Sequence, residues 1–157
     1  MPTPVRIRRG TAADIPAITR HRLGMFAEMK IGDPSTYESY ASEFQEFAAR
    51  AMSSGTFHSW LAETDSGTVV GGGAVMIVPW PANPKDRKQQ RAFLLNVFTE
   101  PGFRRRGIAR SVVREIVEWC RKEGFGSVFL HASDAGRPLY VSMDFHPTTE
   151  LRYDLHP

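Results

Sequence analysis

The stretch GFRRRGIAR, from Gly102 to Arg110, contains residue types that could bind a phosphorylated ligand. Four arginines surround one internal glycine, Gly107, and the stretch runs directly into a segment with helical apolar spacing. Where a strand gives way to a helix, the first backbone N–H groups lack partners inside the helix, and the helix dipole adds positive potential. Glycine lets the backbone approach a ligand closely, and arginine donors match phosphate oxygens. These residues favour an anion-binding turn, and a pyrophosphate is the ligand that fits it.

Other interpretations of this stretch are a solvated charge run and a nucleic-acid contact. The G-x-G-x-x-G dinucleotide fingerprint and the G-x-x-x-x-G-K-[ST] phosphate-binding loop are both absent here, which disfavours a Rossmann or nucleoside-triphosphate enzyme. A net charge of +3 and a pI near 9.3 suit a small polyanionic ligand as well as nucleic acid. Aromatic and basic residues are not interleaved as base stacking requires, so we expect no nucleic-acid partner.

The elements on either side of the turn predict a strand–helix–strand unit. Residues 92–99, AFLLNVFT, form a continuous apolar run of the length of a strand covered on both faces. Apolar residues at four-residue spacing from Ile108 to Cys120 predict an amphipathic helix, which Gly124 ends. A second buried strand is predicted within residues 127–133, SVFLHAS. The turn therefore lies between the first strand and the helix of a βαβ unit.

The rest of the chain supplies the other elements of a mixed α/β (α+β) fold. We expect Asp14 to cap the first helix, with Pro16 in its first turn, rather than a capping box that begins at Thr11. Three glycines, 71–73, are unusual in a strand and predict a bulge or a close backbone approach. The expected elements are a strand at 4–10, helices at 14–26 and 37–51, strands at 56–63 and 68–78, a short helix at 135–143 and a closing strand at 150–155.

Length and composition predict one globular domain. The 157 residues include 41% apolar and 24% charged residues, which is close to the average of soluble proteins. No apolar run approaches the roughly 20 residues that span a bilayer, and the N-terminal residues lack the apolar core of a secretory signal. The single cysteine, Cys120, rules out an internal disulfide and a multi-cysteine metal site. We expect a cytoplasmic protein that binds neither a membrane nor a metal.

The segment NVFTEPGFRRRGIARSVV resembles the signature of the GNAT superfamily of acyl-CoA-dependent N-acetyltransferases. The family pattern [QR]-x-x-G-x-[GA] follows a strand and binds the pyrophosphate of coenzyme A through backbone amides. The resemblance is specific over about residues 92–145 and implies one N-acetyltransferase domain over residues 1–157, with a mostly antiparallel sheet flanked by helices. Arg104, Gly107 and Ala109 stand at the defined positions, Arg105, Arg106 and Ile108 stand at the free ones, and Val97, Phe98 and Thr99 match the strand that pairs with the pantetheine arm.

A second segment, SDAGRPLYVSMDF, resembles the family pattern N-x-x-A-x-x-L-Y-x-x-x-G-F. Ser133 stands at the asparagine position, and this change weakens a coenzyme contact. Asp144 stands at the glycine position, where it replaces a residue that readily adopts a positive φ. The resemblance implies that Tyr140 is the general acid that protonates the departing thiolate, because a phenol with a pKa near 10 is a suitable donor. The alternative for Tyr140 is a packed aromatic residue on a short helix.

The resemblance implies that acetyl-CoA gives its acetyl group to a primary amine by direct attack in a ternary complex. Backbone amides near Phe98 and Thr99 could stabilise the oxyanion. Glu100 is either the base or a solvated loop carboxylate, and Asn96 could orient water or substrate. His131, Glu46 and His58 are weaker candidates for the base, and Cys120 is expected to be a core residue.

The sequence leaves the acceptor amine open. Residues 21–37 and 79–91 are expected to set its specificity, and a small or amino-acid-like amine and a protein amine both remain candidates. The basic cluster in the second segment could attract an acidic group or could be a solvated loop; its members are Lys85, Arg87, Lys88 and Arg91. A homodimer is expected only by analogy, and a non-catalytic acyl-CoA-binding regulatory module of the same fold is the alternative function.

Overall fold

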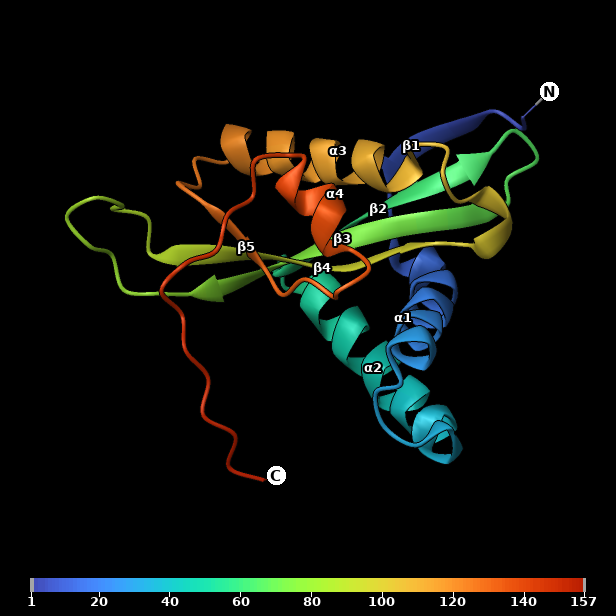
Figure 1. Ribbon diagram of the computed structural model, residues 1–157, viewed down its shortest axis with the longest axis horizontal. Coiled ribbons are helices and arrows are strands. Elements are labelled where there is room, and N and C mark those ends of the chain that lie inside the picture. Colours follow the sequence, from blue (N-terminus) through green and yellow to red (C-terminus); the bar gives the residue numbers. More distant parts are fainter. Residues whose placement is uncertain (1, 157) are drawn as a thin grey trace.

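The computed structural model describes residues 2–156 and places a five-stranded sheet between two layers of helices (Figure 1). The strands lie in the order β1-β2-β3-β4-β5, and every neighbouring pair is antiparallel except the parallel pair β4–β5. This arrangement confirms the predicted fold class and its central βαβ unit. The strands are β1 (Val5–Arg9), β2 (Phe57–Thr64), β3 (Val69–Pro79), β4 (Gln90–Thr99) and β5 (Val128–Leu130), and the helices are α1 (Ile15–Met29), α2 (Tyr37–Ser53), α3 (Ile108–Lys122) and α4 (Arg137–Val141).

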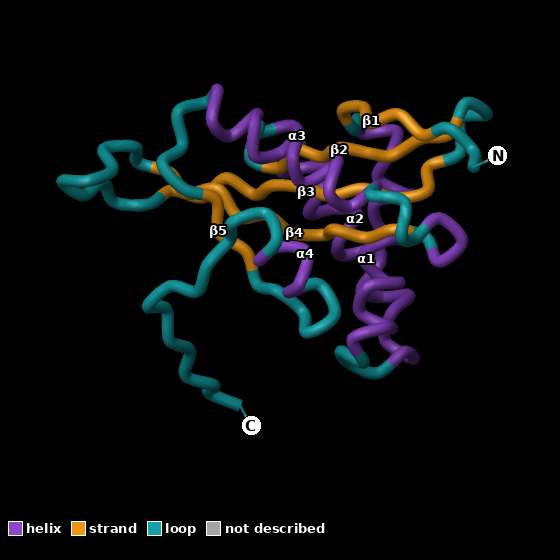
Figure 2. Tube along the Cα trace, turned by 45° about the horizontal axis from the view of Figure 1, so that its top comes forward, coloured by secondary structure: helices purple, strands orange, loops and turns teal. Residues whose placement is uncertain are grey.

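Each face of the sheet has its own hydrophobic core. Helices α1 and α2 cover one face and α3 with α4 the other (Figures 1 and 2). Successive strand residues point to opposite faces, so Leu61 packs with Phe44 of α2 while its neighbour Trp60 packs with Ile116 of α3. The two helical layers therefore fix β4 from both sides. No helix within residues 2–156 is both long enough and apolar enough to span a bilayer.

The glycines of β3 let α3 and β2 approach the strand closely. A Cβ atom on Gly73 would lie 2.9 Å from Val112 Cγ1, and one on Gly72 would lie 2.8 Å from the carbonyl oxygen of Trp60. The register between β3 and β4 also shifts between Gly72 and Ala74. Of the two alternatives expected for this glycine run, the close approach is confirmed, whereas the bulge lies opposite the run, at residues 96–97 of β4.

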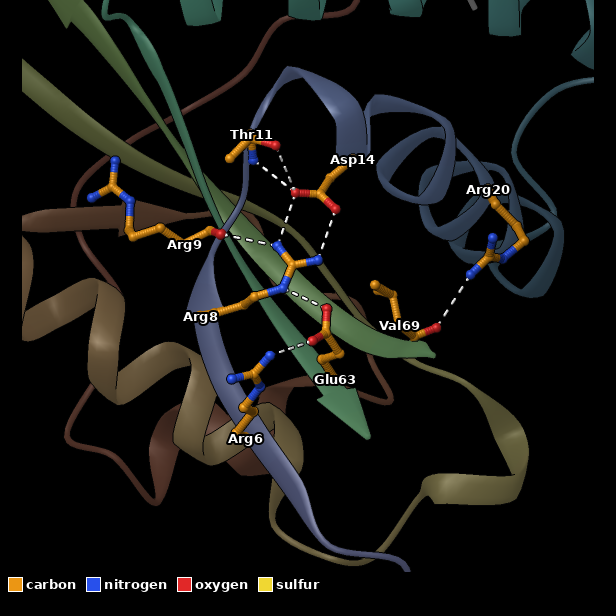
Figure 3. Close-up of polar contacts among 8 residues, drawn as sticks. All are labelled: Arg6, Arg8, Arg9, Thr11, Asp14, Arg20, Glu63 and Val69. Carbon is orange, nitrogen blue, oxygen red and sulfur yellow. Dashed lines mark hydrogen bonds and ion pairs between the residues drawn. The ribbon is translucent and has the colours of Figure 1, made fainter. Parts of the chain in front are cut away.

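The start of α1 differs from the prediction in one detail. The helix begins at Ile15, with Pro16 in its first turn as expected. However, the carboxylate of Asp14 does not cap it: this carboxylate accepts hydrogen bonds from the Thr11 amide at 2.8 Å and from both terminal nitrogens of Arg8 at 2.9 Å (Figure 3). Asp14 instead closes a 3₁₀ turn and forms the capping box with Thr11 that the prediction had set aside. The Arg8 guanidinium also binds this carboxylate, because a charged donor is a stronger partner than a helix amide.

The strand predicted at residues 150–155 does not form. This segment has no regular secondary structure and runs away from the sheet in both views (Figures 1 and 2). Its apolar side chains are almost fully exposed, at 95% for Leu151, 86% for Tyr153 and 81% for Leu155. The prediction was wrong because an alternating pattern is only a local tendency: a strand also needs a neighbour to pair with, and the described residues offer none here.

Candidate functional site

The turn between β4 and α3 leaves the first amides of the helix without protein partners. Arg105 and Gly107 adopt left-handed backbone conformations, with φ of +61° and +75°, and Gly107 precedes the first helical residue. Among the described residues no side chain caps α3, and its first backbone bond runs from the Ser111 amide to the Gly107 carbonyl. The amides of residues 108–110 are therefore available to a ligand.

The three arginines of the turn have different environments. Arg104 donates from Nε to the Thr99 carbonyl at 2.8 Å and forms an ion pair with Glu28 of α1. Arg106 donates to the Gly102 carbonyl at 3.1 Å. Within residues 2–156 the Arg105 side chain makes no hydrogen bond or ion pair. Arg104 thus fastens the turn to β4 and α1, while Arg105 is the arginine that is free to meet an anion.

The end of β4 has an open edge next to this turn. β4 pairs with β5 only at residues 92–94, so the described part of the chain offers no strand beside residues 95–99 on that side. The Glu100 amide donates to the Val70 carbonyl of β3. Because amides alternate along a strand, the Phe98 amide also points toward β3 and the Thr99 amide points to the open edge. Of the two oxyanion donors that we expected, the geometry favours Thr99.

Side chains along this edge separate to the two faces of the sheet. Val97 packs on the α3 side, and Phe98 lies against α1, where a Cβ atom on Gly24 would be 2.9 Å from its ring. Thr99 Oγ1 is buried and has no hydrogen-bond partner among the described residues. Ile108 is buried at the start of α3, and Ala109 beside it is half-buried.

Asn96 forms the bulge that separates the two halves of β4. It is buried, has a φ of +61°, and faces no single partner across β3. Its Oδ1 accepts from Arg22 at 3.3 Å and its Nδ2 donates to the Ile18 carbonyl at 3.3 Å. The side chain therefore ties the bulge to α1 with both of its polar atoms.

Glu100 lies at the end of β4 beside α1. Its Oε1 is 3.3 Å from Arg20 Nε and 3.3 Å from His21 Nε2. His21 is 1% exposed, and the burial of the ring and the Arg20 charge lower its pKa. Its Nε2 makes no well-aligned hydrogen bond with any residue from 2 to 156. Glu100 is thus held by the permanent charge of Arg20 and lies against an imidazole whose pKa is lowered.

Tyr140 lies on α4, which is attached to the first turn of α3. Arg110 of α3 donates to Ser142 Oγ at 2.7 Å, two residues after Tyr140. The ring of Tyr140 is half-buried against Phe145, and burial raises its pKa to about 12. Ser133 Oγ accepts from the Gly136 amide at 3.1 Å and so organises the turn that leads into α4.

A cavity of about 660 Å³ lies along α4, β5 and the second half of α3, and Tyr140 is part of its wall. The anion-binding turn is not part of that wall. Tyr140 therefore lies between this cavity and the first turn of α3, which the Arg110–Ser142 hydrogen bond joins to α4. Asp144, which also lines the cavity, has a φ of +67°, so the position where the family has glycine does require a left-handed backbone here.

The basic cluster of the β3–β4 loop, for which an acidic acceptor and a solvated loop were the two alternatives, is partly held by the protein. Lys88 donates to the Glu123 carbonyl at 2.7 Å, and the Arg91 guanidinium lies 3.8 Å from the centre of the Trp80 ring. Lys85 and Arg87 are exposed. His131 is exposed after β5, Glu46 is exposed on α2, and His58 is bonded to Arg9 at 2.9 Å. Cys120 is buried in the core, as expected.

Sequence reasoning missed His21 and Arg110 as parts of the site. The available signal for His21 was its place on the buried side of α1, three residues after Ile18, where a polar side chain is unusual. No local pattern gave a signal for Arg110, because its hydrogen bond to Ser142 joins residues 32 positions apart.

Known proteins with similar sequences and structures agree with this geometry. The model of the acetyltransferase (GNAT) family matches residues 25–145. N-acetyltransferase 8 of Homo sapiens is 30% identical over 92 residues, which are 57% of this chain and 38% of the relative. N-acetyltransferase 8 of Mus musculus is 34% identical over 99 residues, 61% of this chain and 41% of the relative. The chain thus spans about two fifths of the length of these curated relatives.

Two solved structures share the whole fold. The GCN5-related N-acetyltransferase from Ralstonia eutropha JMP134 aligns with a TM-score of 0.88 and 27% identity over 97% of this chain and 99% of that chain. A predicted acetyltransferase with acetyl-CoA from Clostridium acetobutylicum aligns with a TM-score of 0.83 and 21% identity over 97% of both chains. The chain therefore belongs to the acetyltransferase (GNAT) family of acyltransferases, a family that binds acetyl-CoA.

Proposed function

We propose that this chain transfers an acetyl group from acetyl-CoA to a primary amine by direct attack in a ternary complex. One observation carries the proposal: the open edge of β4 at residues 95–99 continues into the uncapped start of α3 at Ile108. An extended pantetheine arm and a pyrophosphate need these two features side by side. We also propose that residues 1–157 act as one domain.

The coenzyme would bind mainly to the backbone. The amides of Ile108, Ala109 and Arg110 would meet the pyrophosphate, with Gly107 allowing the close approach and Arg105 at the rim. The pantetheine arm would lie along Val97–Thr99. Arg104, Arg106 and Ser133 would act by holding the turn and the start of α4, since each already bonds to the backbone.

The chemistry would use two groups at the ends of this edge. The amine nitrogen attacks the thioester carbonyl carbon and loses a proton, for which Glu100 is the proposed acceptor, directly or through water. The Thr99 amide would stabilise the oxyanion, the carbon–sulfur bond would break, and Tyr140 would give its proton to the thiolate. Asn96 would position β4 rather than touch substrate, because both of its polar atoms are engaged with α1.

The acceptor that we propose is a small or amino-acid-like primary amine. Lys85 and Arg87 are exposed, but they lie in the β3–β4 loop, at the opposite end of β4 from Glu100, so the proposal gives them no part in binding the acceptor. An amine panel that compares small and amino-acid-like amines with a peptide amine would test the acceptor class. Faster turnover of the peptide amine would contradict the proposal.

Titration calorimetry of the whole chain with acetyl-CoA tests the coenzyme site. We expect binding in the micromolar range and loss of binding in Gly107→Glu, which places a carboxylate where the pyrophosphate would lie. Release of free thiol with an amine panel then tests transfer. Binding without thiol release across the panel would instead favour a non-catalytic acyl-CoA-binding module, and absence of binding would overturn the proposal.

A further inference from the structure

Arg22 on α1 is a half-buried cation whose partners are all neutral. Its Nε donates to the Tyr40 hydroxyl of α2 at 2.6 Å, and its Nη1 donates to Asn96 Oδ1 at 3.3 Å. Its guanidinium carbon lies 4.7 Å from the ring centre of Phe26 and 5.0 Å from that of Phe44. Within residues 2–156 it forms no ion pair. Because charges taken out of water are normally paired, this position suits an anion that the described chain does not supply.

Two hydrogen-bond donors at this position are free. Arg22 Nη2 makes no hydrogen bond with any residue from 2 to 156 and is not fully buried, so a ligand can reach it. The Tyr40 hydroxyl accepts from Arg22, but its own proton has no acceptor among the same residues. A carboxylate can accept from a guanidinium N–H and from a neighbouring hydroxyl at the same time. The pair is therefore a suitable site for a carboxylate.

The position lies on the side of β4 from which the amine would arrive. Glu100, the proposed proton acceptor, lies against His21 of α1. Tyr140, the proposed proton donor to the thiolate, belongs to α4 on the opposite face of the sheet (Figures 1 and 2). The amine would therefore enter from the α1 side. Arg22 follows His21 in α1, and its contact with Asn96 places it beside the bulge of β4.

Two neighbouring cations on this side are already paired. Arg20 lies 3.3 Å from Glu100, and Arg104 forms an ion pair with Glu28. A phosphate dianion would need a second free cation, which neither of these arginines supplies. One guanidinium balances the charge of one carboxylate and matches its planar shape. The charges therefore favour a carboxylate over a phosphate.

We propose that Arg22 and Tyr40 bind a carboxylate of the acceptor, and that the acceptor is an amine with a distant carboxylate, such as an ω-amino acid. This inference rests on the proposed acetyl transfer and specifies which amines are used. Asn96 and Thr99, the proposed oxyanion donor, are three residues apart on β4, which is roughly 10 Å in an extended strand. Several bonds would therefore separate the amine from the carboxylate, unlike in an α-amino acid.

Initial rates of thiol release test the assignment with linear amino acids from glycine to ε-aminocaproate, each paired with its amide. We expect the kcat/KM of the unaltered chain to favour the acid by at least about 10-fold among the longer members. In these members the carboxyl group is too far from the amine to change its pKa.

Three variants show whether Arg22 causes this preference. Arg22→Gln should abolish the ratio of acid to amide, and Arg22→Lys, which keeps the charge without the planar fork, should retain part of it. The ratio within each variant cancels a general loss of activity from the broken Tyr40 and Asn96 contacts. Arg87→Gln is the matched control: it removes an exposed arginine from the β3–β4 loop and should keep the full ratio.

A binding measurement makes the test independent of acetyl transfer. Saturation-transfer NMR with caproate, which has the carboxylate but no amine, should detect binding in the presence of coenzyme A to the unaltered chain and to Arg87→Gln, but not to Arg22→Gln. Caproate binding of this kind without thiol release from any amine would support the carboxylate site and overturn the proposed function.

Three results would overturn the carboxylate site and leave acetyl transfer intact. They are equal kcat/KM values for the acids and their amides, an unchanged ratio in Arg22→Gln, and faster turnover of the matching aminoalkyl phosphates.

Discussion

The Nε2 atom of His21 lies 3.3 Å from Oε1 of Glu100 and joins a fully buried ring on α1 to the end of β4. Phe98, two residues before Glu100, packs on the same imidazole with ring centres 5.2 Å apart. The imidazole is thus enclosed by the strand end that we propose to hold the pantetheine arm. Its protonation state therefore affects both the stability of α1 on the sheet and the charge near Glu100.

His21 should make the protein less stable in mild acid. Burial lowers its pKa below the ordinary 6.5, so between that lowered value and pH 6.5 the unfolded chain binds more protons than the folded one. The free energy of unfolding must then fall as the pH drops below about 6.5. Urea titrations from pH 4.5 to 8 should show this slope, and His21→Gln should reduce it.

A half-buried histidine on β2 provides the comparison for this slope. Burial also lowers the pKa of His58, which packs on Trp119 of α3. His58→Gln should remove a separate part of the same slope, and the double variant should remove both parts additively, because the two sites do not touch. An unchanged slope in His21→Gln would show that the ring is not neutral in the folded protein.

Gly107→Ala should weaken acetyl-CoA binding by at least about 10-fold. The alanine must adopt a φ of +75°, which strains the backbone by roughly 1–2 kcal/mol, and its methyl group would point into open space where the pyrophosphate would approach. Calorimetry gives the dissociation constant, and thermal unfolding gives the cost of the strain.

Two other glycines separate the effects of strain and proximity. Gly67 has a φ of +84° in the β2–β3 turn with no atom within 4 Å, so Gly67→Ala should cost similar stability and leave binding unchanged. Gly102 lies near the site, also in open space, but without a positive φ, so Gly102→Ala should affect neither strongly. If Gly67→Ala weakened acetyl-CoA binding as much as Gly107→Ala, general destabilisation would explain the result.

Tyr140→Phe should lower kcat by about 10²-fold or more and leave the dissociation constant of acetyl-CoA nearly unchanged, as expected for a proton donor. Because burial raises the Tyr140 pKa to about 12, the phenol stays protonated throughout the usable range. The kcat profile should therefore show no alkaline loss from this group below about pH 11. Tyr153→Phe is the matched control. A kcat of Tyr140→Phe within twofold of that of the unaltered chain would show that Tyr140 is a packing residue and not the proton donor.

Asp144→Gly should stabilise the protein by up to about 1 kcal/mol, because glycine adopts a left-handed conformation without the steric cost that aspartate bears. Asp144 has a φ of +67° and is exposed, so no packing is lost. Asp65→Gly, in a turn where φ is not positive, is the control and should be neutral or destabilising. Urea unfolding measures both variants, and a destabilised Asp144→Gly would indicate a specific role for the carboxylate.

Most of the fold could be predicted because the signals are local. The stripe from Ile108 to Cys120, the apolar run at 92–99 and Gly107 each mark an element or a turn through neighbours within a few residues. The features that could not be predicted depend on distant partners. Asn96 is recognisable as a polar residue in an apolar strand, but its bonds to Arg22 and Ile18 cross 74 and 78 residues. The strand predicted at 150–155 was wrong for a related reason: its alternating pattern is local, whereas a strand needs a neighbour, and no described strand pairs with this segment.

The carboxylates of Asp14 and Glu63 share one cation, and this sharing should produce a further loss of stability in stronger acid. Arg8 donates from Nε to Glu63 at 2.5 Å and from its terminal nitrogens to Asp14 at 2.9 Å, and Arg6 adds a bond to Glu63 at 2.8 Å (Figure 3). The guanidinium of Arg8 holds the pKa of Asp14 below the ordinary 3.8, and those of Arg6 and Arg8 hold the pKa of Glu63 below 4.5.

Both carboxylates thus stabilise the folded state fully above about pH 5, and their contribution is lost as the pH falls through their lowered values. Arg8→Met should abolish most of this acid dependence and lower the melting temperature by several degrees at pH 7, because it leaves two neighbouring carboxylates without their shared partner. Arg6→Met should have a much smaller effect, since that side chain is 70% exposed and, among residues 2–156, forms an ion pair only with Glu63. Thermal melts at pH 3, 5 and 7 compare the three proteins. Equal effects of the two substitutions on the melting temperature would show that the ion pair of Arg8 with Asp14 contributes no measurable stability. The Asp14 carboxylate, directly before α1, would then be held by the Thr11 amide alone.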